Sequence, residues 1–285
     1  MEYKVKTDGT LLPFLLERMP GRSRSAIKAC LTHGQVAVNG CHTTRHDTPL
    51  KAGDTVTIDK IKTSGTLRHP MLRIVYEDAR LIVADKRNGL LSVGTEKEHR
   101  RTAFYILSEH IKRSNPAARL FVVHRLDRET SGLIIYAKDQ QTQEILQKNW
   151  KEMVLDRRYA AVIEGRLPEP NGTVATLLRE DRNRKMWACL NAPGEEAVTN
   201  YSVLREGRDY SLVELSLRTG KKNQIRAHME WMKTPIAGDK KYGARTNPAG
   251  RVCLHAYKLC FIHPETGRKL EFSTGIPRIF ENAVV

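Results

Sequence analysis

The chain has 285 residues, of which 40% are hydrophobic and 28% charged, and it is long enough to bury a large core without disulfides or metal. Lys and Arg total 48 against 32 Asp and Glu, a formal net charge of +16 that favours a polyanionic partner such as nucleic acid over a charge that serves solubility alone. The five cysteines are odd in number and form no CxxC pair, which argues against a disulfide framework and a zinc site, and no apolar run approaches the ~20 residues of a membrane helix. Because the first residues also lack the pattern of a secretory signal, we expect a soluble, cytoplasmic protein.

Residues 1–60 are expected to form a small unit of two helices and a short twisted sheet. Apolar residues recur at helical spacing over 11–19, and the pattern stops at Pro20. A second helix is expected after a cap at Ser23 or Ser25, and it ends at His33-Gly34, where a left-handed C-cap residue belongs. Two alternating segments then predict strands: QVAVNG, with its Asn-Gly turn, and KAGDTVTID, with its Gly-Asp turn.

Three basic residues, Arg22, Arg24 and Lys28, gather near the start of that second helix. One interpretation is a solvated helix face, which is what most charge clusters are. The other rests on a resemblance. SRSAIKACLTHGQVAVNG followed by LKAGDTVTI resembles the alpha-L RNA-binding domain, which occurs in a ribosomal small-subunit protein and in several RNA-modifying enzymes. The resemblance implies that this basic face binds structured RNA.

Residues 61–73 are polar, are broken by Gly65 and Pro70, and are expected to form a linker. Helices are expected in three later places: 102–113 after a Thr102 cap, 140–150 after an Asp139 cap, and around Arg226. Strands are expected over 73–78, 81–86, 90–93, 133–139, 159–165, 198–203, 211–220 and 254–264. Because strands dominate and most are joined by short turns, the sequence predicts an α+β domain with a mixed, mainly antiparallel sheet.

The segment VHRLDRETSGLIIYAKD places a carboxylate, Asp127, at the mouth of an apolar strand and between two cations, Arg125 and Arg128. Arginine neighbours keep an aspartate ionised, and an ionised carboxylate in a cleft can act as a nucleophile or a base. The residues alone favour a plainer interpretation, an Asx turn in which Asp127 accepts hydrogen bonds from the backbone of Glu129 and Thr130.

A family resemblance reverses that preference. HRLDRETSG resembles, almost letter for letter, the catalytic motif of the RluA-type pseudouridine synthases. Further segments follow in family order: RIVYEDARLIVADKRNGLLSV upstream, then RRYAAVIEG, LRTGKKNQIRAHM, TPIAGDKKYG and LHAYKLCFIHP downstream. The resemblance runs from about Arg73 to Phe272 and implies the pseudouridine synthase fold. It implies that Asp127 is the nucleophile, that Tyr159 is an active-site tyrosine, and that Arg226 pairs with the nucleophile.

The resemblance also implies roles for these side chains on a uridine that has left the base stack. Asp127 would attack the sugar or abstract a sugar proton, and both routes stay open. Tyr159 would stack on the base and could relay the C5 proton, while Arg125 would help to extrude or replace the flipped base. The plainer alternatives are a surface ion pair for Arg226, a strand tyrosine packed in the sheet for Tyr159, and a phosphate contact or charge balance for Arg125. No cofactor or metal is expected.

The chain departs from the family pattern at two places. Lys221 and Asn223 stand where the family usually has Arg and His, and Lys86 is followed by Arg87 where Pro is usual. Lys cannot make the bidentate contact of an Arg, so the contacts made by this loop are in question. Lys221 and its neighbour Lys222 are nevertheless expected to contact RNA.

The segment LREDRNRKMW is expected to be a polar loop. It carries Arg179, Arg182, Arg184 and Lys185 close to Trp187, a combination that suits a nucleic-acid surface but also a solvated loop. Among the scattered histidines, His228 is expected to be structural and not a metal ligand, since nothing has zinc spacing.

Together these features predict three segments: an alpha-L RNA-binding domain over 1–60, the linker over 61–73 and a catalytic domain over 74–285. The expected protein is a monomeric RNA pseudouridine synthase that modifies ribosomal RNA by preference, with transfer RNA also open. The alternative is a non-catalytic RNA-binding or ribosome-assembly factor on the same fold. An enzyme of another class acting on nucleotides is disfavoured, because the chain has no glycine-rich phosphate loop.

Overall fold

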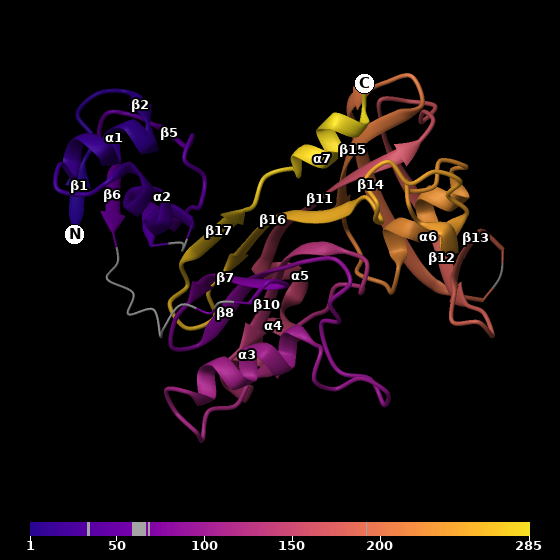
Figure 1. Ribbon diagram of the computed structural model, residues 1–285, viewed down its shortest axis with the longest axis horizontal. Helices are drawn as coiled ribbons and strands as arrows, with labels where there is room; N and C mark the ends of the chain where they lie inside the picture. Colours follow the sequence, from indigo (N-terminus) through magenta and orange to yellow (C-terminus); the bar gives the residue numbers. More distant parts are fainter. Residues whose placement is uncertain (33–34, 59–66, 68, 192) are drawn as a thin grey trace. The chain divides into compact units, whose positions relative to one another are not determined.

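The computed structural model describes residues 1–32, 35–58, 67, 69–191 and 193–285, which divide into two compact units (Figure 1). Unit 1 consists of Met1–Leu126, Gly132–Asp156 and Lys258–Thr274, and unit 2 consists of Asp127–Ser131, Arg157–Tyr257 and Gly275–Val285. The predicted helix end at His33 and Gly34 and most of the predicted linker 61–73 lie outside the described residues. No helix within the described ranges is long and apolar enough to cross a membrane.

The first part of unit 1 consists of short strands around two helices. In chain order its elements are β1 (Glu2–Lys4), β2 (Gly9–Thr10), α1 (Leu11–Arg18), α2 (Arg24–Thr32), β3 (Val36–Val38), β4 (Cys41–His42), β5 (Pro49–Leu50) and β6 (Thr55–Ile58). β6 pairs antiparallel with β1 and β3, and the segment encloses a core of its own that includes Leu15, Ile27 and Val56. Both predicted helices and both predicted strands are present, while the sequence missed β1 and the β2–β5 pair.

Two local signals in this segment acted as expected. The Ser23 hydroxyl accepts a hydrogen bond from the Ala26 amide at 3.2 Å, so Ser23 is the cap of α2. Asn39 and Gly40 have φ values of 51° and 78°, the paired left-handed values that a tight hairpin between β3 and β4 requires.

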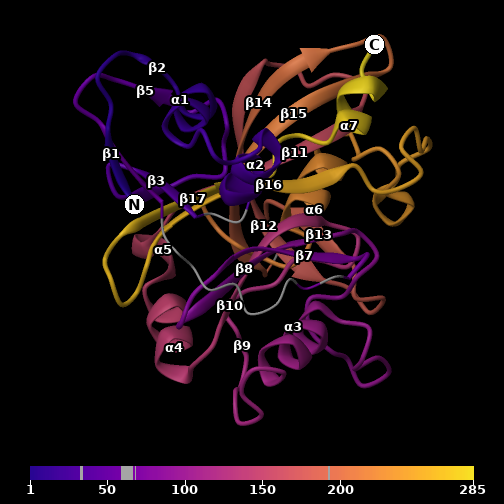
Figure 2. The same cartoon turned by 60° about the vertical axis from the view of Figure 1, so that its left-hand side comes forward.

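The rest of unit 1 is a second, larger sheet segment with helices beside it. Its elements are β7 (Leu72–Glu77), β8 (Leu81–Lys86), α3 (Ala103–Lys112), β9 (Phe121–Val122), β10 (Ser131–Ala137), α4 (Gln140–Lys148), α5 (Trp150–Met153) and β17 (Lys269–Ser273). β8 pairs antiparallel with β7 and with β10, and Figures 1 and 2 both show α3 and α4 beside β8 and β10. The single position at which β4 pairs with β17 is parallel, so the pairing is mixed but mainly antiparallel.

The predicted helix caps of unit 1 are confirmed. The Thr102 hydroxyl accepts from the Tyr105 amide at 3.0 Å, and the Asp139 carboxylate accepts from the Thr142 amide at 2.8 Å. The helix expected over 140–150 ends earlier, at Lys148, and a separate short turn of helix follows as α5. The strand expected over 90–93 is wrong: this segment makes one isolated bridge, and its Ser92 hydroxyl bonds the backbone of Leu126.

Unit 2 contains a long antiparallel sheet with one helix packed on it. Its elements are most of β11 (Val154–Glu164), β12 (Asn171–Glu180), β13 (Met186–Cys189), β14 (Glu195–Glu206), β15 (Tyr210–Leu217), α6 (Gln224–Trp231), the short 3₁₀ turn η1 (Lys240–Tyr242), the first part of β16 (Leu254–Ile262) and α7 (Arg278–Ala283). The strand order is β11-β15-β14-β12-β13, and every neighbouring pair in this series is antiparallel.

Helix α6 lies along β12, β13 and β14, as Figures 1 and 2 both show. The interface is a compact apolar cluster in which Ala227 of α6 and Tyr242 of η1 meet Leu178, Met186 and Ala197 of the sheet. This cluster fixes the helix that carries Arg226 against the sheet.

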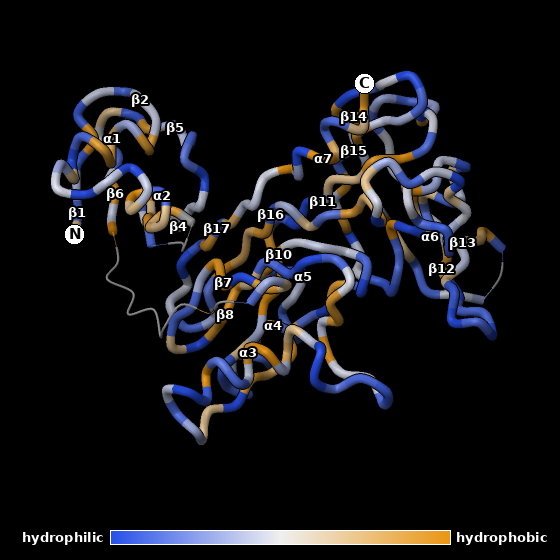
Figure 3. The backbone as a smooth tube through the Cα atoms, viewed as in Figure 1, coloured by the Kyte–Doolittle hydropathy of each residue, from blue (hydrophilic) through white to orange (hydrophobic). Residues whose placement is uncertain are grey.

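The segment LREDRNRKMW is a hairpin and not the predicted loop. Arg179 belongs to β12 and lies opposite Trp187 of β13, while residues 181–185 form the turn. The Asp181 carboxylate accepts from the amides of Asn183 and Lys185, both at 2.8 Å, and so closes the turn. The sequence did not predict these strands because their charged residues lie on the exposed side, which alternates with the buried side, and at the hydrophilic tip of the hairpin (Figure 3).

Two histidines are buried in unit 2 as neutral groups. The ring nitrogens of His228 lie 2.8 and 3.0 Å from the hydroxyls of Thr199 and Thr176, and burial lowers the pKa of His228 to about 4. Burial likewise lowers the pKa of His255 to about 3. The hydrogen bonds of His228 to two threonines agree with its expected structural role.

The neutral His228 makes stability depend on pH. The unfolded chain takes up a proton near pH 6.5, whereas the folded protein resists protonation down to about pH 4, so stability falls as the pH drops through this window. We expect a loss of up to ~3 kcal/mol over the window from His228, which His228→Gln should reduce. Urea unfolding at pH 7 and pH 5, which spans about 2 kcal/mol of this loss, measures the effect, with the exposed His46→Gln as control. An equal pH dependence in His228→Gln and wild type would assign the effect to other groups.

Candidate active site

Asp127 lies in a turn that hydrogen bonds hold on both sides in the sequence. In unit 1 the buried Ser92 hydroxyl accepts from the Leu126 amide at 3.0 Å and donates to the Leu126 carbonyl oxygen at 2.6 Å. In unit 2 the Ser131 hydroxyl lies 2.7 Å from Nδ1 of His255. The residues that flank the turn are therefore fixed by side-chain hydrogen bonds, which restricts where the Asp127 carboxylate can point.

The Asp127 carboxylate is half-buried, and its charge reaches buried groups from other elements. It raises the pKa values of Tyr159, Arg226 and Tyr242, although it is not the largest influence on any of them. The amide of Thr130 donates to the backbone carbonyl oxygen of Asp127 at 3.2 Å, so this contact of the turn is made by the main chain. The unit thus gathers around Asp127 the two residues that the resemblance singled out.

Tyr159 is positioned by β11, where it lies opposite Leu215 of β15, and only 7% of it is exposed. Burial raises the pKa of its phenol, the positive charge of Arg157 lowers it, and the negative charge of Asp127 raises it further. The result is a phenol that keeps its proton at neutral pH. The plainer interpretation, a strand tyrosine packed in the sheet, describes its location but not its electrostatic link to Asp127.

Arg226 is held by α6 in a buried ion pair with Asp239. Its Nε and Nη2 donate to the two carboxylate oxygens of Asp239 at 2.6 and 2.7 Å, and its Nη1 donates to Oδ1 of Asn223 at 3.2 Å. The guanidinium carbon lies 4.7 Å from the centre of the Tyr242 ring. Arg226 is 6% exposed and Asp239 is 1% exposed, so this pair is not the surface ion pair of the alternative interpretation.

The environment of Arg226 keeps it charged. Burial lowers its pKa, but the hydrogen bonds and charge of Asp239, with the charge of Asp127, outweigh burial and leave the pKa above its ordinary value. Arg226 donates hydrogen bonds to Asp239 and Asn223, and the negative charge of Asp127 adds to the rise of its pKa. The sequence had assigned the pairing to Asp127 and had no role for Asp239, although Asp239 stands within the quoted segment TPIAGDKKYG.

The loop before α6 contains the departures from the family pattern at Lys221 and Asn223. Asn223 has a φ of 52°, a left-handed conformation that Asn tolerates better than most residues. Gln224 holds the loop, because its Oε1 accepts from the Thr219 hydroxyl at 2.8 Å and from the Lys221 amide at 3.0 Å. Its Nε2 donates to the Thr199 hydroxyl at 2.9 Å and ties the helix start to β14.

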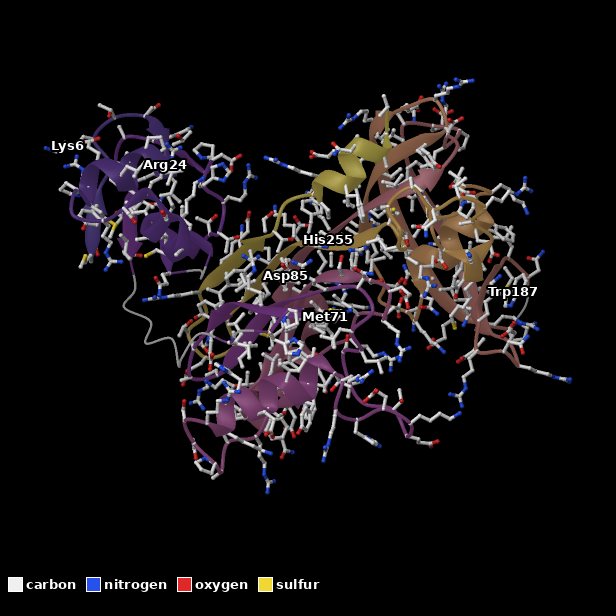
Figure 4. All side chains as sticks on the ribbon, in the orientation of Figure 1. Lys6, Arg24, Met71, Asp85, Trp187 and His255 are labelled. Carbon is white, nitrogen blue, oxygen red and sulfur yellow. The ribbon has the colours of Figure 1, made fainter. Side chains whose placement is uncertain are left out.

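The lysines expected to contact RNA are paired with acidic side chains on the surface. Lys221 binds Glu195 at 3.0 Å, and Lys222 forms an ion pair with Glu180. In unit 1 the expected RNA-contact residues Arg22, Arg24, Lys28 and Arg125 are all exposed. Arg128, which follows Asp127 in unit 2, is exposed as well. Arg24 and Lys28 are one helical turn apart and so share a face of α2, from which Arg24 projects in Figure 4.

The β12–β13 hairpin brings a basic and aromatic surface to the same unit as Asp127. Lys185 lies 4.3 Å from the centre of the Trp187 ring and 5.1 Å from that of Tyr242, and it forms a 2.7 Å ion pair with Glu230 of α6. Trp187 is 46% exposed on β13 (Figure 4), and Arg182 is exposed at the tip. The hairpin is therefore linked to the elements that carry Arg226 and Tyr242.

The family follows from comparison with known proteins. The RNA pseudouridylate synthase family matches residues 80–231, more than half of the chain. The chain belongs to this family. It is 34% identical to the uncharacterized RNA pseudouridine synthase YlyB of Bacillus subtilis, over 90% of this chain and 86% of that protein. It is 33% identical to the ribosomal large subunit pseudouridine synthase D of Neisseria meningitidis serogroup B, over 94% of this chain and 76% of that protein.

A solved structure supports the fold of this pseudouridine synthase. The human RNA pseudouridylate synthase domain containing 4 superposes with a TM-score of 0.60 at 26% identity, covering 74% of this chain and 90% of that one. The expected family, the α+β pseudouridine synthase fold and the isomerase activity on RNA are confirmed.

The left-handed backbone at Asn223 predicts an unusual order of stabilities. Asn223→Ala places a Cβ in a conformation that ordinary side chains avoid, whereas Asn223→Gly removes the same hydrogen bond without that strain. We expect the Ala variant to be less stable than the Gly variant by about 1 to 2 kcal/mol, as measured by urea unfolding. If Ala were as stable as Gly, the turn before α6 would not depend on the left-handed conformation.

Proposed function

We propose that this pseudouridine synthase isomerises uridines of structured RNA with Asp127 as its nucleophile, and that ribosomal RNA is its preferred substrate, with transfer RNA second. One observation carries the assignment of Asp127: the charge of this half-buried carboxylate acts on Tyr159, Arg226 and Tyr242, which reach it from β11, α6 and η1. Each of these four residues stands in a different segment that resembles the family.

The reaction breaks the bond between N1 of uracil and C1′ of the ribose and forms a bond between C5 and C1′. Asp127 acts as an anion, either by attacking C1′ or by abstracting a sugar proton, and Arg226 beside it favours that ionised state. The base turns within the pocket and bonds to C1′ through C5. This step displaces Asp127 from C1′ on the first route, while on the second route Asp127 returns the sugar proton. C5 then loses its proton and N1 gains one. Atoms therefore balance without an oxidant, a reductant or a second substrate.

Tyr159 and Arg125 support this step in the proposal. Tyr159 stacks on the uracil, and its phenol, which burial keeps protonated, can relay the C5 proton: it takes up this proton as it passes its own toward N1. The exposed Arg125 helps to extrude the uridine or fills the space that it leaves, at an unstacking cost of a few kcal/mol.

RNA recognition in the proposal rests on basic surfaces. The segment 1–60 acts as an alpha-L RNA-binding domain through Arg22, Arg24 and Lys28, followed by the linker 61–73 and the catalytic domain 74–285. Lys221 and Lys222 contact RNA by exchanging their glutamate partners for phosphates. A preference for ribosomal RNA fits relatives that are named for the large ribosomal subunit. We further propose that the protein acts as a monomer in the cytoplasm.

Removal of the nucleophile is the direct test. Asp127→Asn should abolish tritium release from cellular RNA labelled at uridine C5 and leave RNA affinity largely intact, because Asn keeps the shape and loses the charge. Glu129→Gln, which neutralises a carboxylate of the same turn, is the matched control and should retain activity. Release by Asp127→Asn at the wild-type rate would exclude Asp127 as nucleophile. Tight binding without release by wild type on any RNA would favour the non-catalytic binding factor.

The basic surface predicts strong salt dependence of RNA binding. Each phosphate contact contributes about 0.7 to 0.9 to the slope of log affinity against log salt. The double variant Arg24→Ala/Lys28→Ala should therefore reduce the slope by about 1 to 2. Lys6→Ala/Lys51→Ala removes the same charge from exposed positions of the same segment and should change the slope less. Equal slopes for the two double variants would show that the face of α2 does not touch RNA.

A further inference from the structure

Arg226 and Asp239 make more hydrogen bonds than the neutralisation of one charge requires. Asp239 uses both carboxylate oxygens on Arg226, and Asn223 takes a third N–H, so three of the five guanidinium N–H donors are engaged. The Tyr242 ring lies 4.7 Å from the guanidinium carbon. The plane of the guanidinium is thereby fixed by contacts from η1 and from the loop before α6.

The backbone around Asp239 is equally constrained. The amide of Asp239 donates to the Ile236 carbonyl oxygen at 2.9 Å, and its own carbonyl accepts from the amides of Tyr242 and Ala244 at 2.9 and 3.1 Å. Gly238, directly before it, has a φ of 83°, and a Cβ there would collide with the carbonyl oxygen of Arg251. These contacts fix the backbone from which the Asp239 carboxylate reaches Arg226.

We propose that Asp239 is a positioning residue for the isomerisation: it orients Arg226 toward the Asp127 region and balances the charge of Arg226, so that Asp127 stays reactive. The inference rests on the proposed role of Asp127. It assigns Asp239 no contact with RNA and no bond to the reacting atoms.

The physical reason lies in how one cation is shared between two carboxylates. If Arg226 had only Asp127 as its anion, it would stabilise the resting Asp127 carboxylate, and this stabilisation would be lost when the carboxylate is used in the reaction. With Asp239 bonded to it, Arg226 forms a neutral pair before and after that step. Asp239 therefore offsets the desolvation free energy of the buried cation, and Asp127 does not have to do so.

The charged and titratable groups around the pair define the expected pH effect. They are Arg157 and Tyr159 on β11, Tyr242 beside Asp239, and Lys185 of the hairpin, which faces Tyr242. Replacing Asp239 by Asn removes one negative charge from this group. The positive charge of Arg226 is then balanced by Asp127 alone. Asp127 then holds its proton less strongly and is also a weaker nucleophile.

Steady-state kinetics of the full chain on uridine-labelled RNA across pH tests the proposal. Asp239→Asn should lower kcat about 10- to 100-fold, the loss expected for one charged hydrogen-bonded partner, leave KM for RNA unchanged, and move the acid limb of the kcat profile to lower pH. Asp239→Glu restores the negative charge but shifts the two carboxylate oxygens away from their positions on Arg226. Its acid limb should therefore return to the wild-type position while kcat stays reduced. Because Asp239→Glu keeps the buried charge, its kcat and pH profile still test the proposal if the Asn variant folds poorly.

Glu164→Gln is the matched structural control. The Glu164 carboxylate accepts from the amides of Arg245 and Thr246 at 2.9 and 2.7 Å, and so braces the loop that follows η1 without touching Arg226. This variant should lower the melting temperature and leave the pH profile in place. If Asp239→Asn behaves like Glu164→Gln, Asp239 is merely structural and the proposal is overturned.

A double-variant cycle completes the test. In an Arg226→Gln background, Asp239→Asn should have no further effect on the acid limb, because Asp239 acts through Arg226. A wild-type kcat and profile in Asp239→Asn, with Asp127→Asn inactive, overturns this inference alone. Activity in Asp127→Asn overturns the proposed nucleophile instead, so the two failures are distinguishable.

Discussion

A buried positive charge is the constraint around which unit 2 is arranged. A guanidinium that is almost fully removed from water must have an anion and hydrogen-bond acceptors at fixed positions, and Arg226 obtains them from Asp239 and Asn223. Meeting this requirement sets the start of α6, the conformation of the loop before it and the turn at η1. The apolar cluster between α6 and the sheet keeps that arrangement in register.

The antiparallel sheet explains how distant parts of the sequence reach one place. Tyr159 lies in β11, Arg226 follows β15, which pairs with β11, and Tyr242 packs with α6 on β12, β13 and β14. Because each strand is hydrogen-bonded to its neighbours, the side chains that surround Asp127 are carried by one continuous hydrogen-bonded support. The charged side chains of such a site are held in fixed orientations. Electrostatic stabilisation of a reaction by pre-oriented groups requires this rigidity.

The sequence predicted the features that depend on few neighbouring residues. The caps at Thr102 and Asp139, the turn at Asn39 and the helix around Arg226 follow from local patterns, and the family followed from motifs in order. The partner of Arg226 could not be predicted, since thirteen positions separate it from Asp239 and only the tertiary fold joins them. The β12–β13 strands were missed for another reason: charged residues on the exposed side of a half-buried hairpin look like a loop when burial is unknown. The roles of Asp127, Tyr159 and the RNA-contact residues stay predictions.

Gln224 shows how much of the active-site helix rests on the direction of a single amide group. Its oxygen accepts from Thr219 and Lys221, while its nitrogen donates to the Thr199 hydroxyl and to the Val198 carbonyl oxygen at 3.1 Å. Hydrolysis of this amide to a carboxylate would leave two oxygens, one of them against a carbonyl that needs a donor. A carboxylate at this position, which has nearly the same size and shape as the amide, would therefore loosen the start of α6.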